Sequence, residues 1–332
     1  MKKLRIGVLS TAKIGLEKVI PAMQQGQLTE VTAISSRSVD KARAAAEALG
    51  INKHYGSYEE LLADPEIDAV YNPLPNYLHC PWSKKAMQAG KHVLCEKPLG
   101  LTGEEIEDLI ATRDECGVMA AEAFMVKSCP QWIDARERVR GAEIGDLRAI
   151  QAFFSYDNRD PGNIRNIVET GGGAMWDIGC YPVVISRYLF ESEPLRAAAT
   201  IDFDPSMKTD RLASVVLEFN QGQATFTVST QLVPYQRVHL LGTTGHLELV
   251  IPFNAPNDRS CILRYDSGTL LEEEVVSHSF PVMDQYTLQG DDFARAVLEG
   301  TEIKSTLEDG LANTRVIKAI FTAAKEQRWV TI

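Results

Sequence analysis

The stretch that decides the fold is Leu4-Arg5-Ile6-Gly7-Val8-Leu9-Ser10-Thr11-Ala12-Lys13-Ile14-Gly15. Its first six residues read as a buried β-strand, and a helical segment follows the turn. Ser10 and Ala12 stand where a Gly-x-Gly-x-x-Gly fingerprint has its first two glycines. Both are small enough for a pyrophosphate to approach the backbone, although the first turn should lose the freedom of glycine for positive φ. The position between strand and helix predicts a dinucleotide-binding loop. Its expected cofactor-binding residues are Gly7, Ser10, Thr11, Ala12, Lys13 and Ile14.

Short β-rich segments alternate with helical ones over the first 120 residues. This rhythm is typical of βαβ units and predicts a doubly wound parallel sheet, that is, an α/β Rossmann domain over residues 1–122. The expected strands are Leu4–Leu9, Glu30–Ile34, Ala69–Tyr71, His92–Cys95 and Val118–Ala121, and the expected helices include Asp40–Leu49, Trp82–Ala89 and Gly103–Glu115.

After about residue 150 the chain is dominated by strand-like runs separated by Gly and Asn turns. They indicate an α+β domain over residues 123–306 with a large, open, mostly antiparallel sheet and helices on one face. The tail, residues 307–332, contains the amphipathic segment Leu307–Glu326, which we expect to pack back onto the Rossmann domain. The clearest strands are Ser214–Phe219, Ala224–Thr230, Arg237–Leu241 and His246–Val250.

Composition limits the possible functions. The 332 residues are 45% apolar and carry a net charge of −11, with no basic block, which argues against a nucleic-acid partner. The run Ile6-Gly7-Val8-Leu9 is too short for a signal-peptide core, and no run is long enough to span a membrane. Six widely spaced cysteines predict reduced, mostly buried thiols and a cytoplasmic protein without a metal site. They are Cys80, Cys95, Cys116, Cys129, Cys180 and Cys261.

The second strand ends in Ser35-Ser36-Arg37-Ser38, about 20 residues after the loop. No Asp or Glu occupies the position that binds a ribose hydroxyl, whereas small hydroxyl residues flank an arginine whose planar fork suits a monophosphate. Ser36, Arg37 and Ser38 therefore favour NADP over NAD. The alternative is that Arg37 only caps the strand end in solvent.

Glu96-Lys97-Pro98 follows the apolar run His92–Cys95. It places an amine at the carboxyl end of a parallel strand, where ligands bind in open sheets and where desolvation lets a lysine take part in proton transfer. The alternative is a surface lysine beside a helix-starting proline.

A second constellation lies in Gly171-Gly172-Gly173-Ala174-Met175-Trp176-Asp177-Ile178-Gly179-Cys180-Tyr181. The glycines allow a close approach to another backbone or a ligand. If a helix begins near Ala174, Asp177 and Tyr181 share one face and can move a proton. Otherwise Asp177 is a helix-turn acid and Tyr181 a core aromatic residue.

Together these motifs resemble the Gfo/Idh/MocA oxidoreductases over essentially the whole chain. Besides the loop, Ser36-Arg37-Ser38 and Gly171–Tyr181, the similar segments are Asn72–His79 and Ala89–Pro98. The resemblance implies a Rossmann domain followed by an open sheet whose flat face pairs subunits into a homodimer or homotetramer. It also implies contact of Lys97 with the nicotinamide ribose and the substrate. Further cofactor contacts are expected from Pro73, Leu74, Asn76, His79 and Glu96.

One departure narrows the subgroup, because many members carry Asp-x-x-x-His where this chain has Asp177 and Tyr181. With a tyrosine at position 181, the chain resembles the branch of the family that contains dimeric dihydrodiol dehydrogenase, NADP-dependent D-xylose 1-dehydrogenase and glucose–fructose oxidoreductase. Asp160–Asn166 also resembles the sugar dehydrogenases of that branch, which would place Asn163 and Arg165 beside the substrate. The alternative is an exposed loop with a helix cap.

The resemblance implies reversible hydride transfer between NADP and a sugar or polyol, with no metal required. Tyr181 would be the acid/base, Lys97 its electrostatic partner and Asp177 an orienting group. An aldose such as D-xylose, or a trans-dihydrodiol, fits these residues. The open alternatives are a keto-sugar reductase, a glycoside hydrolase that retains its cofactor, and a non-catalytic regulator.

Overall fold

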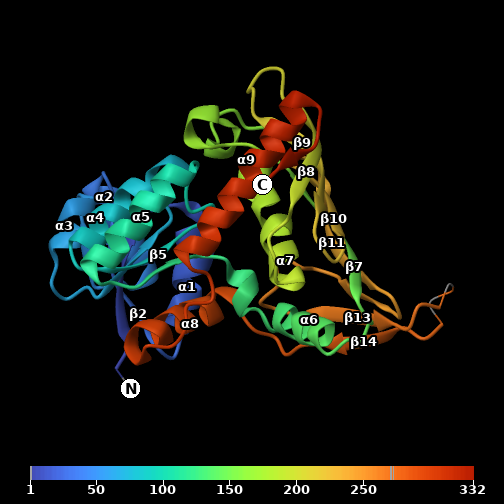
Figure 1. Ribbon diagram of the computed structural model, residues 1–332. Coiled ribbons are helices and arrows are strands. Elements are labelled where there is room, and N and C mark those ends of the chain that lie inside the picture. Colours follow the sequence, from blue (N-terminus) through green and yellow to red (C-terminus); the bar gives the residue numbers. More distant parts are fainter. Residues whose placement is uncertain (1, 270, 272) are drawn as a thin grey trace. The chain divides into compact units, whose positions relative to one another are not determined.

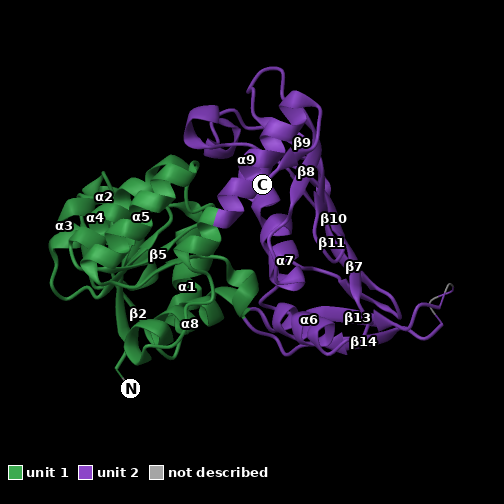
Figure 2. Ribbon diagram, in the orientation of Figure 1, with its two compact units in different colours: residues 1–128, 284–311 green, residues 129–283, 312–332 purple. Residues whose placement is uncertain are grey.

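The computed structural model describes residues 2–269, 271 and 273–332. The chain forms two compact units, shown in different colours in Figure 2. The first unit comprises residues 2–128 and 284–311, and the second comprises residues 129–283 and 312–332. The dinucleotide-binding motifs therefore lie in the first unit, and the glycine-rich motif with Asp177 and Tyr181 lies in the second.

A six-stranded parallel sheet forms the centre of the first unit, in the order β3-β2-β1-β4-β5-β6. This confirms the predicted Rossmann architecture. The strand order reverses between β1 and β4, and in sheets of this kind ligands bind at the carboxyl ends of the strands beside that point. The strands are β1 (Leu4–Leu9), β2 (Thr29–Ser35), β3 (Lys53–Tyr55), β4 (Ala69–Asn72), β5 (His92–Cys95) and β6 (Ala120–Glu122).

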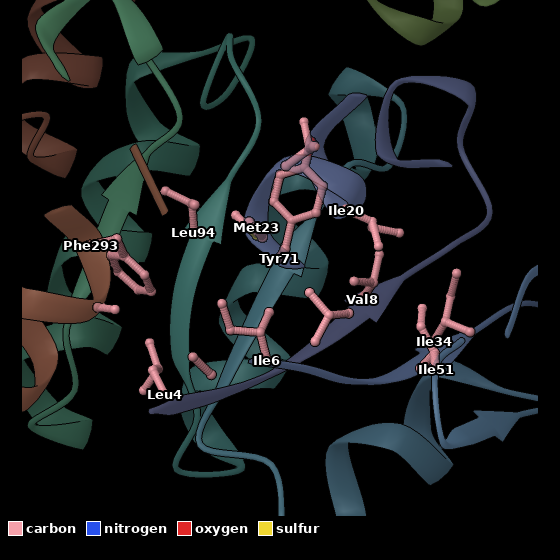
Figure 3. Packing of buried hydrophobic residues seen from close by; sticks show 14 of the residues in the cluster. Leu4, Ile6, Val8, Ile20, Met23, Ile34, Ile51, Tyr71, Leu94 and Phe293 are labelled. Atoms are coloured by element: carbon pink, nitrogen blue, oxygen red, sulfur yellow. The ribbon is translucent and has the colours of Figure 1, made fainter. Parts of the chain in front are cut away.

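Helices bury both faces of this sheet (Figure 1). Leu4, Ile6 and Val8 of β1 lie on one face, where Figure 3 shows them gathered with Tyr71 and Phe293. Alternate strand residues enter a second core on the other face, as the period of two in a strand requires. The first face is covered by α1 (Ile20–Gln24), α2 (Val39–Leu49) and α8 (Gln285–Glu299), and the second by α3 (Tyr58–Ala63), α4 (His79–Gln88) and α5 (Gly103–Cys116).

The second unit contains a nine-stranded sheet in the order β14-β13-β12-β11-β7-β10-β9-β8-β15. Only the β7–β10 pair is parallel among its described pairings, so the expected mostly antiparallel sheet is confirmed. The strands are β7 (Leu147–Asp157), β8 (Arg196–Phe203), β9 (Asp210–Glu218), β10 (Gln223–Ser229), β11 (Gln231–Gly242), β12 (His246–Leu249), β13 (Ile262–Asp266), β14 (Val276–Ser279) and β15 (Val330–Thr331).

Helices cover one face of this sheet. They are α6 (Pro130–Arg140), α7 (Cys180–Phe190) and the part of α9 (Leu307–Glu326) that follows residue 311 (Figure 1). Strand residues alternate accordingly: Ala213, Val215 and Leu217 of β9 are buried, whereas Ser214 and Val216 are half-exposed. On β9 the other face of the sheet thus carries Ser214 and Val216, and Phe153, Arg237 and His239 of neighbouring strands also line it.

The observed division of the chain differs from the predicted boundaries in two places. Residues 284–306, which contain α8, join the first unit because Phe293 enters the core beside β1 and Asp291 accepts the backbone N–H groups of Gln27 and Leu28. Residues 312–332 join the second unit, since Phe321 packs on Trp176 and β15 pairs with β8. Only the first turn of the tail lies with the Rossmann unit.

Candidate functional site

The loop after β1 adopts the conformation that a glycine would normally provide. Ser10 has φ = +84°, so the expectation that serine removes positive φ from this turn is wrong. The Ser10 backbone N–H donates to the carbonyl of Ser35, and its hydroxyl accepts the N–H of Ala12 at 3.3 Å. These bonds hold a serine in a region that L-residues rarely occupy, next to the point where the strand order reverses.

Gly7, within β1, and Gly15, after the loop, have different surroundings. A Cβ on Gly7 would lie 2.8 Å from Leu61 Cδ2 and 3.0 Å from Ile67 Cδ1, so core packing accounts for Gly7. A Cβ on Gly15 would have only ordinary contacts, the nearest at 3.7 Å from Pro73. Thr11, Ala12 and Ile14 are half-exposed and Lys13 is exposed.

The helix after the loop begins with a π-helical turn, Gly15–Val19, before α1. Pro21 lacks an N–H and its ring would clash with the carbonyl four residues earlier in an α-helix, so a widened turn accommodates it. The sequence pattern indicated a helix here but not its wide first turn.

At the end of β2 the three predicted residues have distinct roles. The Ser36 hydroxyl accepts the Ser38 N–H at 3.3 Å, and the Ser38 hydroxyl accepts the Lys41 N–H and caps α2. Arg37 is exposed. Burial raises the pKa of Tyr58, and the positive charge of Arg37 opposes this rise. No carboxylate occupies this strand end in Ser35–Ser38.

The loop after β4 is built around Asn72 and His79. Pro73 and Leu74 are buried and Asn76 is half-buried. The Asn72 amide donates to the His79 carbonyl at 3.1 Å and to the Ser83 hydroxyl at 3.0 Å. The segment is therefore fixed by its own polar contacts.

Glu96 and Lys97 stand at the carboxyl end of β5, as predicted. The Glu96 carboxylate accepts the hydroxyl of buried Tyr71 at 2.6 Å, and its N–H donates to the Asn72 carbonyl. Burial and the Glu96 charge raise the pKa of Tyr71 well above its usual value, so it remains a donor. Lys97 is half-exposed and precedes Pro98 through a cis peptide bond.

These features of the first unit fit a dinucleotide. Ser10 presents a positive-φ turn beside the reversal of strand order, and Arg37 with Ser36 lies at the end of the next strand. Such an arrangement holds a pyrophosphate on the loop and a phosphorylated ribose at the arginine. Lys97 lies at the strand end two positions away from β1 in the sheet.

The second unit carries a polar cluster around Asp177. Its carboxylate accepts the hydroxyl of Tyr156 at 2.5 Å and lies 3.0 Å from Nε of Arg165. The Asp177 side chain is 13% exposed, so its charge is largely removed from water. Burial, and next the negative charge of Asp177, raise the pKa of Tyr156 well above its usual value. The cluster is therefore an ionised carboxylate held by a neutral phenol and a guanidinium.

Tyr181 follows on the same helix, in an aromatic setting. It is 5% exposed, and its ring packs edge-on against Phe154, with 5.8 Å between centroids, and is tilted by 51° against Phe253, with 5.4 Å between centroids. Asp177 lies inside a π-helical turn, Met175–Gly179, and Tyr181 lies in α7, which follows that turn. As in the first unit, a proline, Pro182, follows the wide turn. Such turns are frequent at functional sites.

Asp210 of β9 anchors the start of this helix. Its buried carboxylate accepts the Met175 N–H at 2.6 Å, and a Cβ on Gly173 would lie 1.8 Å from its Oδ1. Gly173 has φ = +118°, so both space and backbone conformation require glycine. Burial raises the pKa of Asp210 to about 7, against the opposing effect of the backbone N–H groups.

The loop before this helix is held by close contacts of Gly172 and Gly173 with the backbone of Arg165. A Cβ on Gly172 would lie 2.6 Å from the Arg165 carbonyl, which also accepts the Gly173 N–H. The Asn163 side chain accepts the Arg165 N–H at 3.0 Å and begins the 3₁₀ turn Ile164–Asn166. Arg165 is thus positioned from both sides, whereas the Asn163 oxygen is engaged in a local cap.

The remaining predictions concern the cysteines, metal ligands and membrane-spanning helices. All six cysteines are free and five are buried. In residues 2–269, 271 and 273–332, no group of three or more potential metal ligands gathers. Within the same residues, no helix is both long and apolar enough to cross a membrane.

Comparison with known proteins assigns the chain to a class. A model described as "Oxidoreductase family, NAD-binding Rossmann fold" matches residues 4–124, and the "GFO/IDH/MocA C-terminal domain" matches residues 132–248. The chain belongs to the Gfo/Idh/MocA family of oxidoreductases, which confirms the resemblance seen in its motifs.

Individual relatives cover the chain almost completely. It is 45% identical to an uncharacterized oxidoreductase, ORF334, of Rhizobium meliloti over 100% of both chains. It is 36% identical to D-xylose 1-dehydrogenase (NADP(+)) 2 of Haloferax volcanii over 97% of this chain and 98% of that protein. Among solved structures, KijD10, a 3-ketoreductase from Actinomadura kijaniata in complex with NADP and TDP-benzene, matches with a TM-score of 0.90 and 29% identity over 97% and 98% of the two chains.

Sequence reasoning missed three residues that organise the site. Tyr156 lies on a strand that the sequence analysis did not mark, and Tyr71 and Asp210 lie outside every motif. The signal for Tyr156 was available, because residues 147–157 contain the β-rich run Ile150–Tyr156. Nothing local could have paired Asp210 with Gly173.

Proposed function

We propose that this protein transfers a hydride between NADP and a free sugar, with an aldose such as D-xylose as the substrate. The observation that carries the proposal is the Asp177 carboxylate held by Tyr156 and Arg165, with Tyr181 on the same helix. A fixed acceptor and a phenol suit recognition and deprotonation of a hydroxyl group. Arg37, at a strand end without a carboxylate, supports NADP over NAD.

The proposal gives each residue a separate task. Tyr181 exchanges a proton with the substrate oxygen, and the positive charge of Lys97 favours the phenolate form of Tyr181. The Asp177 carboxylate accepts a hydrogen bond from a neighbouring sugar hydroxyl and fixes the orientation of the ring. NADP, when bound, supplies the hydride acceptor. The aromatic surroundings of Tyr181, with Phe154 and Phe253, exclude water from its ring.

Charge on the loop before the site helix favours a neutral sugar over a nucleotide-linked one. Arg165 lies at Asp177, and Arg159 donates to Asp157 at 2.9 Å. Both guanidinium groups already face a carboxylate, so binding a diphosphate there would require breaking an ion pair. The 36% identity to a D-xylose 1-dehydrogenase that uses NADP points the same way.

Keto-sugar reduction is the second candidate, because the 3-ketoreductase KijD10 matches this fold with a TM-score of 0.90. The same residues would then act in reverse, with Tyr181 donating the proton. A trans-dihydrodiol is a further possible substrate for the oxidative direction.

The test is absorbance at 340 nm with purified protein, NADP or NAD, and a panel of aldoses, inositols, trans-dihydrodiols and keto-sugars. We expect reduction of NADP by a pentose or hexose and much slower reduction of NAD. Lys97→Met and Tyr181→Phe should each lower turnover by about 10² or more while NADP still binds. The control is Tyr265→Phe, which removes a hydroxyl from a half-exposed residue of β13 that does not line the hollow of the uncovered sheet face. Turnover that survives in both site variants would contradict the assigned roles.

We also propose that the uncovered face of the second unit's sheet pairs subunits into a dimer or tetramer. A hollow of about 680 Å³ on this face is lined by Phe153, Val216, Thr225 and Thr227 among other residues of β7 to β11. Its lining also includes Tyr235, Arg237 and His239, so the face combines apolar and polar groups, as interfaces between subunits do. Light scattering on the wild-type protein and on Val216→Glu tests this, and a monomeric wild type would refute it.

Cell fractionation tests the cytoplasmic location that the sequence predicts.

A further inference from the structure

His79 joins two loops at the carboxyl edge of the Rossmann sheet. Its Nδ1 lies 2.7 Å from the carbonyl oxygen of Pro98, and its Nε2 lies 2.6 Å from that of Leu74. Leu74 belongs to the loop after β4, and Pro98 to the turn after β5. The ring is 1% exposed, so no part of it meets solvent. One buried side chain thus connects the segments that follow two neighbouring strands.

The turn that carries Lys97 is held at the residues on either side of it. The Glu96 N–H donates to the Asn72 carbonyl at 3.0 Å, and the Leu99 N–H donates to Glu122 Oε1 at 2.7 Å. Pro98, the residue that follows Lys97, has its carbonyl oxygen 2.7 Å from Nδ1 of His79. The position of the Lys97 backbone therefore depends on His79 as well as on the sheet.

We propose that His79 is a positioning residue for Lys97, and that it acts by holding the Pro98 and Leu74 carbonyl groups rather than by binding the cofactor. The role rests on the proposed function of Lys97. Both ring nitrogens are already occupied by backbone oxygens, and a cofactor ligand would need an accessible ring atom. The proposal thereby differs from the sequence-based expectation that His79 contacts the cofactor.

The ring's charge state fits this role. Burial lowers the pKa of His79 to about 4, and the positive charge of Lys97 acts in the same direction against the two carbonyl groups. At neutral pH the ring is therefore uncharged and has one N–H, so it donates a hydrogen bond to only one of the two carbonyl groups, and the other carbonyl group contacts the ring without accepting one. A neutral ring does not compete with Lys97 for an anionic group.

The kinetic test compares His79→Leu and His79→Gln with His54→Gln, a control at an exposed histidine of β3. Leucine removes both contacts, and we expect kcat to fall about 10- to 100-fold, since displacing a catalytic group by about 1 Å costs this much. Glutamine keeps one donor and should recover part of the loss. KM for NADP should change less than about threefold in all variants if the ring does not bind the cofactor. Equal kcat in His79→Leu and wild type would overturn the proposal, and so would a rise in KM for NADP without loss of kcat.

A second readout does not depend on turnover. Lysines are converted to ¹³C-dimethyl-lysine, and the Lys97 signal is assigned by its disappearance in Lys97→Arg. We expect that signal to move in His79→Gln and to stay in place in His54→Gln. If it stays in place in His79→Gln while the variant is folded, His79 does not position Lys97. This result stands even if no sugar is oxidised, so failure of the inference is separable from failure of the proposed function.

Discussion

The hydroxyl of Tyr156 donates a 2.5 Å hydrogen bond to Oδ2 of Asp177, whose Oδ1 faces Arg165 at 3.0 Å. Each carboxylate oxygen thus has its own donor, one from β7 and one from the loop before the site helix. The carboxylate cannot rotate without breaking one of these contacts, so its orientation is fixed.

Tyr156→Phe removes the donor to Oδ2 and keeps the ring. Because hydrogen bonds to a charged group contribute about 1.5–3 kcal/mol, we expect kcat/KM for the sugar to fall roughly 10- to 100-fold, with NADP affinity unchanged. Steady-state kinetics at saturating NADP measures this, and Tyr265→Phe, at a half-exposed residue of β13, is the control. Kinetics that match the wild type would show that Arg165 alone orients Asp177.

Arg37 should determine cofactor choice. It is exposed at the end of β2, and a guanidinium pairs well with a 2′-phosphate. We expect Arg37→Ala to lower the ratio of kcat/KM for NADP to that for NAD by about 10- to 100-fold, mainly through KM for NADP. Lys13→Ala, at the exposed end of the phosphate loop, is the comparison, because its charge does not distinguish the two cofactors. An unchanged ratio in Arg37→Ala would assign the arginine to a surface role beside Tyr58.

Ser10 holds a backbone conformation that larger residues resist. At φ = +84° a β-branched side chain clashes with the backbone, so Ser10→Val should lower the free energy of unfolding by about 1–3 kcal/mol and weaken NADP binding. Ser10→Gly should bind NADP like the wild type. Denaturant unfolding and cofactor titration of both variants check this, and a stable Ser10→Val protein would mean that the turn relaxes freely.

Much of the first unit was predictable because each of its signals is local. β1 and β5 have the predicted bounds, and the buried strands read as apolar runs because both faces of the sheet are covered. The second unit was harder. Its strands bury one face only, and α6 and α8 were not recognised as helices. Whether α8 packs in the first unit depends on Phe293, which enters the same core as Leu4, nearly 290 residues earlier in the sequence. No local pattern encodes this contact.

The candidate site shows the same limit. Motifs located Lys97, Arg37, Asp177 and Tyr181, because their residue types stand at recognisable spacings. The groups that hold them come from elsewhere in the chain, as with Tyr156, and pairing of this kind follows from the tertiary fold alone. Ser10 shows a different limit, since a positive φ at serine is imposed by neighbouring hydrogen bonds against its own preference.

Gly173 should tolerate no side chain. Gly173→Ala places a Cβ 1.8 Å from Asp210 Oδ1, and the cap on the site helix must move. Gly268→Ala is the matched control, because Gly268 also has positive φ, +95°, but has no atom within 4 Å of the added Cβ. We expect Gly173→Ala to lose about 2 kcal/mol or more of unfolding free energy beyond the loss in Gly268→Ala, together with most turnover. Equal losses would show that the contact with Asp210 costs nothing.

His79 should make stability depend on pH in the acid range. Its pKa is about 4 in the folded protein against an ordinary value of 6.5, so below pH 6.5 the unfolded chain binds the extra proton more readily. The contribution of His79 is therefore complete above pH 6.5 and is lost as the pH falls toward 4, to the extent of about 3 kcal/mol. Asp210 acts in the opposite direction, because its raised pKa of about 7 lowers stability as the pH rises from 4 to 7.

The two effects can be separated by difference. Urea unfolding of wild type and His79→Gln at intervals between pH 4 and pH 7 gives two curves, and Asp210 contributes equally to both. We expect the wild type to lose stability relative to His79→Gln as the pH falls, because glutamine has no proton to gain. Parallel curves would mean that His79 titrates alike in the folded and unfolded chains, which would contradict the lowering of its pKa by burial.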